Sequence, residues 1–274
     1  LSRPEWRPDF GPAAFDARRG ATVIGARDFL AAYNVNLDTT SRDLAHEIAC
    51  DVRTSGRVIR DPGGAERRVP GTLRAAKAIG AAGYRNLGTL EFLVGPDGKP
   101  YFIEINCRIQ VEHPVTEVVT GVDLVALQIA LAGGAKMLMK QSEIQARGHA
   151  IEFRITAEDP AQNFQPQAGE ISAYRSPSGP WVRYNSHLYA GYEVPPYYDS
   201  LLAKLIVWGN TREEAIARSR AALLEVEIDG VATTRDFFLG LLETPSFLKG
   251  TATTSMLDTI GTADILAAAP KARA

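Results

Sequence analysis

Cysteine and histidine are scarce in this chain of 274 residues. The two cysteines, Cys50 and Cys107, are too few for a disulfide framework. The four histidines show no paired metal-ligand spacing. These absences exclude a disulfide-stapled scaffold and favour a reducing, cytoplasmic setting.

Strong net charge and long apolar runs are also missing. The net charge of −2 gives no field that would attract nucleic acid or an anionic membrane. No apolar run approaches the roughly 20 residues of a transmembrane helix, and the Pro-rich N-terminus lacks the apolar core of a signal peptide. With 45% hydrophobic and 23% charged residues, the composition is that of a soluble globular protein with one large or two modest domains. We therefore expect neither nucleic acid nor a membrane as a partner.

Residues 103–112 carry the most informative pattern, because apolar and polar side chains alternate there without a break. The polar members are Glu104, Asn106, Arg108, Gln110 and Glu112. An alternation of period two is typical of a strand with one buried face, and an ordinary solvated strand shows it too. This polar set, however, suits chemistry: a carboxylate beside an amide oxygen suits Mg²⁺, a guanidinium suits a planar oxyanion, and a further carboxylate can act as a base. We interpret the stretch as a site.

A predicted hairpin adds a second carboxylate. Thr89–Val94 and Tyr101–Asn106 flank GPDGKP, whose Asp-Gly is typical of a tight reversal. Glu91 and Glu104 would then lie on neighbouring strands and can share a face, where like charges are disfavoured without a cation. With the Asn106 oxygen, they predict a magnesium site.

The two ends of this stretch cannot meet if it is straight. Glu104 and Glu112 are eight positions apart, which corresponds to about 26 Å in a strand that rises about 3.3 Å per residue. Either the chain bends within residues 107–111, or the two ends bind different parts of a large ligand. His113-Pro114 should then end regular strand pairing.

The later residues predict helices and an antiparallel sheet. Thr116 and Glu117 are expected to cap a helix from about Val118 to Gly133. His149–Thr156 alternates, with Glu152 and Arg154 outward. Further expected elements are strands at 169–174, 181–184, 201–208 and 227–231, a helix after the Thr211/Glu214 capping box, a helix at 234–242 and an Ala-rich tail that frays.

The first 80 residues have a different character. They predict two short strands within 20–37, a helix at 42–53, a loop rich in Gly, Pro and Arg at 54–70, and a second helix at 71–80. Through RRGATVIGARDFLAAYNVNLDTT and PGTLRAAKAIG, residues 4–80 resemble the formiminotransferase family. The resemblance implies a partial ferredoxin-like α/β segment from a folate-binding subdomain. His46 matches no catalytic motif, so this segment by itself should not transfer a formimino group.

From about residue 81 to 258, the sequence resembles the C-terminal half of biotin carboxylases. GYRNLGTLEFLV and RIQVEHPVTE carry the resemblance, together with the turn-rich YAGYEVPPYYDS. It implies an α+β chain with the C-terminal part of an ATP-grasp fold at 81–140, an antiparallel-sheet domain at 141–260 and a tail at 261–274. The stretch AAKAIG fits both families and no linker separates them, so the sequence looks like a chimera.

The resemblance also implies roles for single residues. Glu91, Glu104 and Asn106 would bind Mg²⁺ (or Mn²⁺) with ATP as substrate. Arg108, Gln110, the Val111 backbone and Glu112 would form the bicarbonate site, where Arg108 grips the anion and Glu112 is the base. Arg154 would stabilise the enolate-like charge on biotin, for which Lys lacks the planar hold.

The implied activity needs partners and parts beyond these residues. Biotin would arrive on a carboxyl carrier domain or protein, and Arg183 matches a family position near a homodimer interface. The family also uses an N-terminal nucleotide-fold domain and a Gly-rich lid, whereas no Gly-rich phosphate loop occurs in this sequence. We therefore expect weak or no ATP turnover by this chain alone. A folate-binding module and an inactive dimerising scaffold remain the alternatives.

Overall fold

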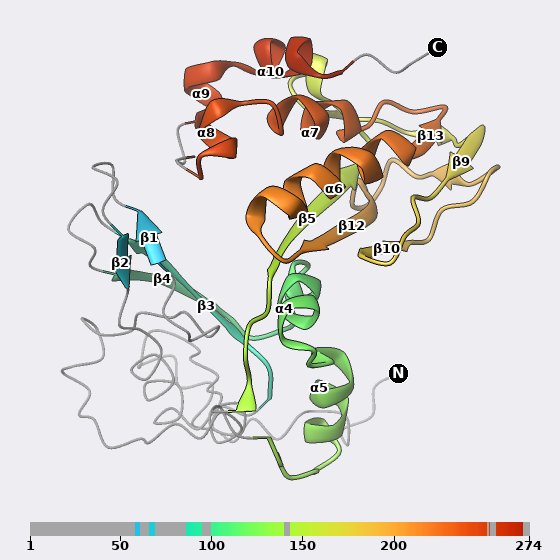
Figure 1. Cartoon of the computed structure of the whole chain (residues 1–274). Helices are drawn as coiled ribbons and strands as arrows, with labels where there is room; N and C mark the ends of the chain where they lie inside the picture. The colour runs from blue at the N-terminus through green and yellow to red at the C-terminus, as the bar shows by residue number, and fades with distance from the viewer. Residues whose placement is uncertain are drawn as a thin grey trace, which may run out of the picture. The chain divides into compact units, whose positions relative to one another are not determined.

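The computed structural model describes residues 58–60, 66–68, 86–94, 100–139, 143–250, 252 and 256–270. The chain divides into two compact units, Leu1–Ala146 and Arg147–Ala274 (Figure 1). Helices mix with strands, and every described strand pair is antiparallel, which confirms the α+β class. The strands predicted within 20–37 and the helices predicted at 42–53 and 71–80 lie outside the described residues.

The first unit contains two strand pairs. β1 (Val58–Arg60) pairs with β2 (Glu66–Arg68) inside the segment predicted as a loop, so that prediction is wrong for these residues. Val58 and Ile59 favour extended backbone, and the intervening sequence, DPGGA, is rich in turn formers. β3 (Thr89–Val94) pairs with β4 (Pro100–Asn106), which confirms the predicted hairpin.

Two helices follow where one was predicted. α4 (His113–Thr120) begins before Val118, because Pro114 in its first turn has a preset φ and needs no N–H partner. It ends at Gly121, whose left-handed φ of 73° lets its N–H bond to the Glu117 carbonyl at 2.8 Å. α5 (Leu124–Ala132) then runs in a new direction, with a bend of 103° between the helices.

Glu117 caps the second helix, not the first. Its side chain is buried, and Oε1 accepts a hydrogen bond from the Leu124 N–H at 2.8 Å. The Asp123 side chain accepts one from Ala126 N–H at the same distance. Both therefore satisfy N–H groups that a helix start leaves without partners. In the described part of the chain, no single helix has the length and hydropathy of a membrane span. The bent pair of α4 and α5 reaches them only when the two helices are taken together, by length and composition alone.

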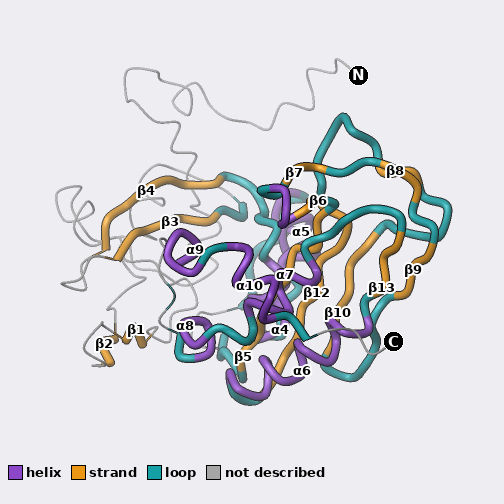
Figure 2. The backbone as a smooth tube through the Cα atoms, turned by 90° about the horizontal axis from the view of Figure 1, so that it is seen from above, coloured by secondary structure: helices purple, strands orange, loops and turns teal. Residues whose placement is uncertain are grey.

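The second unit is built on a three-stranded antiparallel sheet. Its strands are β10 (Val182–Ser186), β12 (Leu201–Gly209) and β5 (His149–Thr156), in that order (Figures 1 and 2). Short strands form pairs around it: β6 (Glu158–Asp159) with β7 (Gln165–Pro166), β8 (Gly169–Glu170) with β11 (Glu193–Val194), and β9 (Ala173–Arg175) with β13 (Glu227–Asp229). A short 3-10 helix, η5 (Pro160–Gln162), connects β6 to β7.

Helix α6 (Arg212–Glu225) and helix α7 (Arg235–Leu241) contribute to the core of this unit. Phe153, Ile155 and Leu205 from the sheet and Leu223 from α6 are almost fully buried in one apolar cluster. The alternating apolar positions of β5 therefore face α6, as the period of two predicts, and Leu205 and Val207 of β12 belong to the same cluster.

The predicted fraying of the C-terminal tail is wrong for residues 262–268. α8 (Pro245–Leu248) and α9 (Met256–Ile260) are followed by α10 (Thr262–Ala268), and Ile265 is fully buried. Gly240 in α7 permits this packing, because a Cβ there would come within 1.8 Å of the Ile265 carbonyl oxygen. Close helix contact, which alanine composition alone does not reveal, holds the tail.

Arginines satisfy carbonyl groups at three helix ends. Arg212 donates to the Phe247 and Leu248 carbonyls at 2.7 and 3.1 Å. Arg220 donates to Leu242 at 2.7 Å, and Arg235 to Val226 at 2.8 Å. The last carbonyls of a helix have no partner within that helix, and these arginines supply one. Because each arginine belongs to a different helix from the one whose end it bonds, the contacts join α6, α7 and α8.

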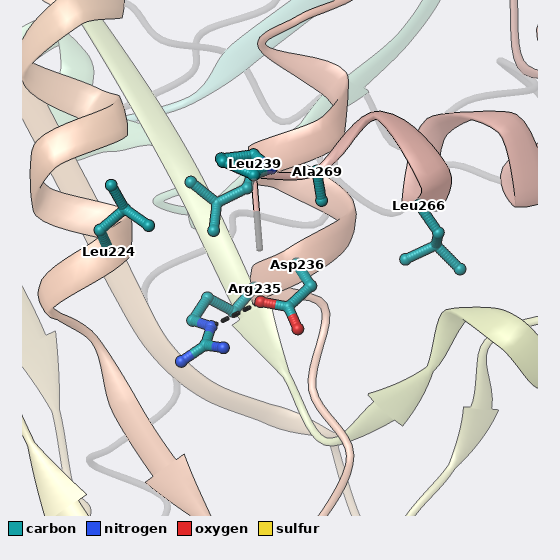
Figure 3. Close-up of a pocket in the computed structure, with 7 residues that line it drawn as sticks. Leu224, Arg235, Asp236, Leu239, Leu266 and Ala269 are labelled. Atoms are coloured by element: carbon teal, nitrogen blue, oxygen red, sulfur yellow. Dashed lines mark hydrogen bonds and ion pairs between the residues drawn. The ribbon is translucent and has the colours of Figure 1, made fainter. Parts of the chain in front are cut away.

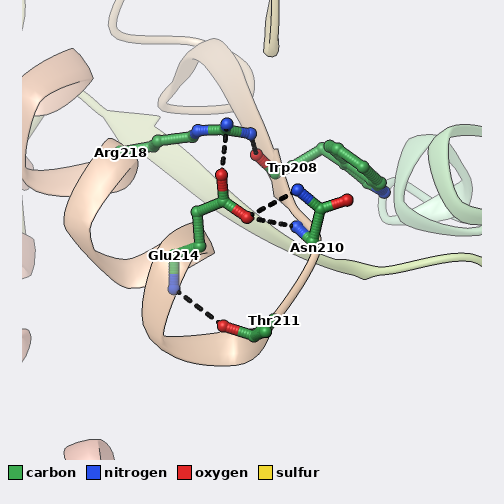
Figure 4. A network of polar contacts seen from close by, with 5 residues as sticks. All are labelled: Trp208, Asn210, Thr211, Glu214 and Arg218. Atoms are coloured by element: carbon green, nitrogen blue, oxygen red, sulfur yellow. Dashed lines mark hydrogen bonds and ion pairs between the residues drawn. The ribbon is translucent and has the colours of Figure 1, made fainter.

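The predicted capping box opens α6 (Figure 4). Thr211 Oγ1 accepts from the Glu214 N–H at 3.2 Å, and the Glu214 carboxylate accepts from the Asn210 backbone N–H at 2.7 Å. Hydrogen bonds from the backbone and side chain of Asn210 lower the pKa of the Glu214 carboxyl. The same carboxylate pairs with Arg218, which donates to the Trp208 carbonyl at 2.9 Å. The end of β12 and the start of α6 are thus one polar network.

Leu223→Ala should destabilise the second unit by about 2–5 kcal/mol, because it empties a fully buried position. The matched control is Leu224→Ala, since Leu224 is 49% exposed and should cost less than about 1 kcal/mol. Urea unfolding followed by tryptophan fluorescence measures both. Equal losses for the two variants would contradict the assigned face of α6.

Glu117→Ala should cost about 1–3 kcal/mol, because it leaves the buried Leu124 N–H without its partner. Glu112→Ala is the control on the same helix: Glu112 is exposed, and its side chain makes no capping hydrogen bond. Amide hydrogen exchange should rise at the start of α5 only in the Glu117 variant. Unchanged exchange there would show that Asp123 is a sufficient cap.

Candidate functional site

The predicted site residues of the first unit lie where a strand becomes a helix. β4 ends at Asn106, and Glu112 is the N-cap of α4 with φ −82° and ψ 5°. The prediction of one strand from 103 to 112 is therefore wrong beyond Asn106, whereas the bend expected within 107–111 is present. Its cause is the early helix start, since Pro114 cannot donate to a strand ladder.

His113 stabilises this bend. Its backbone N–H donates to the Gln110 carbonyl at 3.2 Å, and its Nδ1 lies 2.7 Å from the same oxygen. The ring therefore holds the Gln110 backbone close to the helix start. Gln110 and Val111 are half-buried, and Glu112 is exposed at the end of the turn.

Arg108 links the two predicted ends of the site. Its side chain is exposed, and its Nη2 donates to the Asn106 Oδ1 at 3.4 Å. Its Nη1 donates to the Ile109 carbonyl at 3.2 Å. The Arg108 guanidinium, expected at the anion end, thus contacts the Asn106 amide, expected at the metal end. Residues two positions apart lie on the same face of a strand, so this contact does not itself require the bend.

Glu91 and Glu104 occupy directly opposed positions in the β3–β4 ladder. The register shifts between Glu91 and Phe92, and Asn106 is opposite Thr89 at the end of the pair. Two carboxylates and an amide oxygen are hard oxygen donors, a set that fits Mg²⁺ completed by water and phosphate. In the part of the chain that the structure describes, no cluster of three or more His, Cys, Asp or Glu residues forms an all-protein cage.

Arg154 belongs to the second unit, whereas the residues predicted to bind magnesium and bicarbonate belong to the first. It is exposed on β5 between the buried Phe153 and Ile155, as predicted. Glu152 was predicted to point into solvent, but its carboxylate oxygens are buried. Ile206, opposite Glu152 in the register, is only 1% exposed, so this part of the outer sheet face is covered.

A pocket of about 260 Å³ lies elsewhere in the second unit (Figure 3). It is lined mainly by apolar side chains from α6, α7 and the end of α10, and Arg235 pairs with Asp236 at 2.8 Å at its edge. None of the residues predicted for the site lines it.

Three family models match the chain. Residues 152–259 match the biotin carboxylase C-terminal domain, and residues 66–140 match the ATP-binding domain of the carbamoyl-phosphate synthase L chain. Residues 32–83 match the formiminotransferase domain. The last two matches overlap at 66–83, which includes the AAKAIG stretch that fits both families.

Two curated relatives each match about two thirds of this chain. The biotin carboxylase of Nostoc sp. is 51% identical over 183 residues, which cover 67% of this chain and 41% of the relative. Biotin carboxylase 1 of Bacillus subtilis is 50% identical over 186 residues, which cover 68% of this chain and 41% of the relative. The chain thus spans about two fifths of the length of the relatives that it matches.

Solved structures give the same result. The biotin carboxylase subunit of pyruvate carboxylase has a TM-score of 0.71 at 41% identity, over 78% of this chain and 46% of the other. The biotin carboxylase domain dimer of Hydrogenobacter thermophilus 2-oxoglutarate carboxylase, in complex with MgADP, ADP and bicarbonate, has a TM-score of 0.68 at 44% identity, over 70% and 42%. Over two thirds of its length, the chain is therefore homologous to biotin carboxylases, with residues 152–259 matching their C-terminal domain, and residues 32–83 match the formiminotransferase domain.

Proposed function

We propose that the chain is part of an ATP-grasp ligase that carboxylates biotin with ATP and bicarbonate. One observation carries the proposal: the opposed pair Glu91/Glu104 leads directly into the turn that bears Arg108 and Glu112. A group that can bind a cation and a group that can bind an anion thus follow one another in a chain that is about 50% identical to biotin carboxylases over two thirds of its length. The 81–140 and 141–260 segments are the proposed domains.

The metal–nucleotide end consists of Glu91, Glu104 and Asn106. Bound Mg²⁺ would neutralise charge on the ATP phosphates, as metal ions do in phosphoryl transfer. The residues on the hairpin supply only part of its ligands, since Mg²⁺ usually takes one or two carboxylates with phosphates and water. The related Hydrogenobacter domain in complex with MgADP and bicarbonate supports this assignment.

The bicarbonate end consists of Arg108, Gln110, Val111 and Glu112. The exposed guanidinium of Arg108 presents donors to the planar anion, which a fork of N–H groups matches well. Glu112 then accepts the bicarbonate proton as the anion oxygen attacks the γ-phosphate of ATP. The products are ADP and carboxyphosphate, which releases CO₂ and phosphate.

Arg154 acts on the second substrate. The phosphate released from carboxyphosphate takes the proton of the biotin ureido nitrogen. Negative charge then develops on the ureido oxygen, and the nitrogen attacks CO₂ to form the N–carboxylate bond. A guanidinium placed at that oxygen stabilises the charge through planar, charge-assisted hydrogen bonds. Its exposed position on β5 makes it accessible to a ligand carried by another protein.

The remaining proposals concern partners and location. We propose a biotin carboxyl carrier domain or protein as the donor of biotin, a homodimer through the C-terminal domain near Arg183, and a cytoplasmic location. The dimer in the Hydrogenobacter structure supports the second of these. The match of residues 32–83 to the formiminotransferase domain favours a second candidate, a folate-binding module. A third candidate is an inactive dimerising scaffold.

Calorimetry with Mg-ATP and then with a folate separates the three candidates. We expect the 274-residue chain to bind Mg-ATP. The Glu91→Gln/Glu104→Gln double variant should bind it at least about tenfold more weakly, because the metal loses charged ligands. The exposed Glu170→Gln is the matched control. Binding of the folate alone would favour the second candidate, and binding of neither ligand would favour the scaffold.

Turnover is the second arm of this test. ATP hydrolysis by the isolated chain should be weak or undetectable, because its sequence contains no Gly-rich phosphate loop. Bicarbonate-dependent hydrolysis that free biotin stimulates and Glu112→Gln abolishes would contradict that expectation. It would at the same time support Glu112 as the base.

A further inference from the structure

One row of side chains crosses the three-stranded sheet of the second unit. Arg154 on β5 is opposite Lys204 on β12, and Lys204 is opposite Asn185 on β10. Residues opposed in an antiparallel pair have Cβ atoms about 4.5–5.5 Å apart. The three side chains therefore belong to one short line across the strands.

This row lies on the outer face of the sheet. The neighbouring row, Phe153, Leu205 and Tyr184, belongs to the core packing beneath α6. Because successive side chains alternate between faces, the row of Arg154, Lys204 and Asn185 faces the other way. In the single chain, Arg154 and Asn185 are exposed and Lys204 is half-buried, so a ligand can reach the row.

The charges around this row are predominantly positive. Arg183, two positions before Asn185, donates from Nε to the Asn185 Oδ1 at 3.0 Å and adds a third cation to Arg154 and Lys204. Glu152, two positions before Arg154, supplies the one carboxylate of these two rows. An anion placed beside two cations that are directly opposed in a ladder is attracted by both of them.

We propose that Lys204 is a further residue of the biotin site. Together with Arg154, it binds a negatively charged cyclic urea that bears a carboxylate. The inference rests on the proposed function, because biotin is the cyclic urea that is carboxylated there. The planar fork of Arg154 orients the urea oxygen, and the ammonium of Lys204 provides a compact charge for the carboxylate one strand away. The exposed Asn185 amide completes the row as a neutral donor.

Binding to the row can be measured without turnover. Amide NMR of the full chain would be titrated with 2-imidazolidinone-1-acetate, a stable cyclic urea with a carboxylate, and separately with bicarbonate. The cyclic urea should shift the resonances of residues 154, 185 and 204, whereas bicarbonate should shift those of 107–112. Lys204→Met should weaken binding of the cyclic urea about tenfold or more, and Lys204→Arg should keep it within a few-fold.

Two further variants keep the test decisive if Lys204→Met does not fold. Asn185→Asp changes an exposed residue and places a negative charge in the row, so it should also weaken the cyclic urea about tenfold. Lys249→Met removes an exposed lysine elsewhere in the same unit and should have no effect.

Three results would overturn the inference. The first is that the cyclic urea shifts no amide resonance of the row. The second is that Lys204→Met and Asn185→Asp both bind the cyclic urea with unchanged affinity. The third is that bicarbonate, and not the cyclic urea, shifts the resonances of the row. Failure of the proposed function has a different signature, because Mg-ATP would not bind while the cyclic urea still shifted the row.

Discussion

The passage from strand to helix between Asn106 and His113 is the constraint on which the candidate site depends. Extended backbone ends at Asn106, and Pro114, which cannot donate to a ladder, starts a helix instead. The intervening turn carries Arg108 and Glu112 and is held by the contacts of His113 with the Gln110 carbonyl. The residues proposed to bind metal and those proposed to bind bicarbonate are thereby joined by one short turn.

The second unit depends on a different constraint, the register of its antiparallel sheet. One face of β5 and β12 is apolar and packs with α6, and arginine side chains tie the ends of α6, α7 and α8 into the same body. The opposite face carries Arg154, Lys204 and Asn185 in one row, and the buried Ile206 lies in the row of Glu152 and Arg183. A rigid sheet holds such groups in fixed rows, which is the property a binding site needs.

Local patterns predicted much of this structure. Alternation and an Asp-Gly turn indicated the β3–β4 hairpin, and a Thr-x-x-Glu box indicated the start of α6. Alternation alone was misleading before α4, because it continues past the end of the strand, where the helix that Pro114 begins takes over. Composition was misleading at α10, because Ile265 packs against Gly240, a contact between residues of two different helices.

By itself, the sequence determined the candidate residues and the homology to biotin carboxylases, because side-chain chemistry and spacing can be read from it directly. It also indicated where two different resemblances meet, near residue 80. The tertiary structure alone decided which residues share a row, since strand register joins positions far apart in the chain. Lys204 illustrates this: its neighbours Ala203 and Leu205 indicate no function for it, and only the pairing of β12 with β5 places it opposite Arg154.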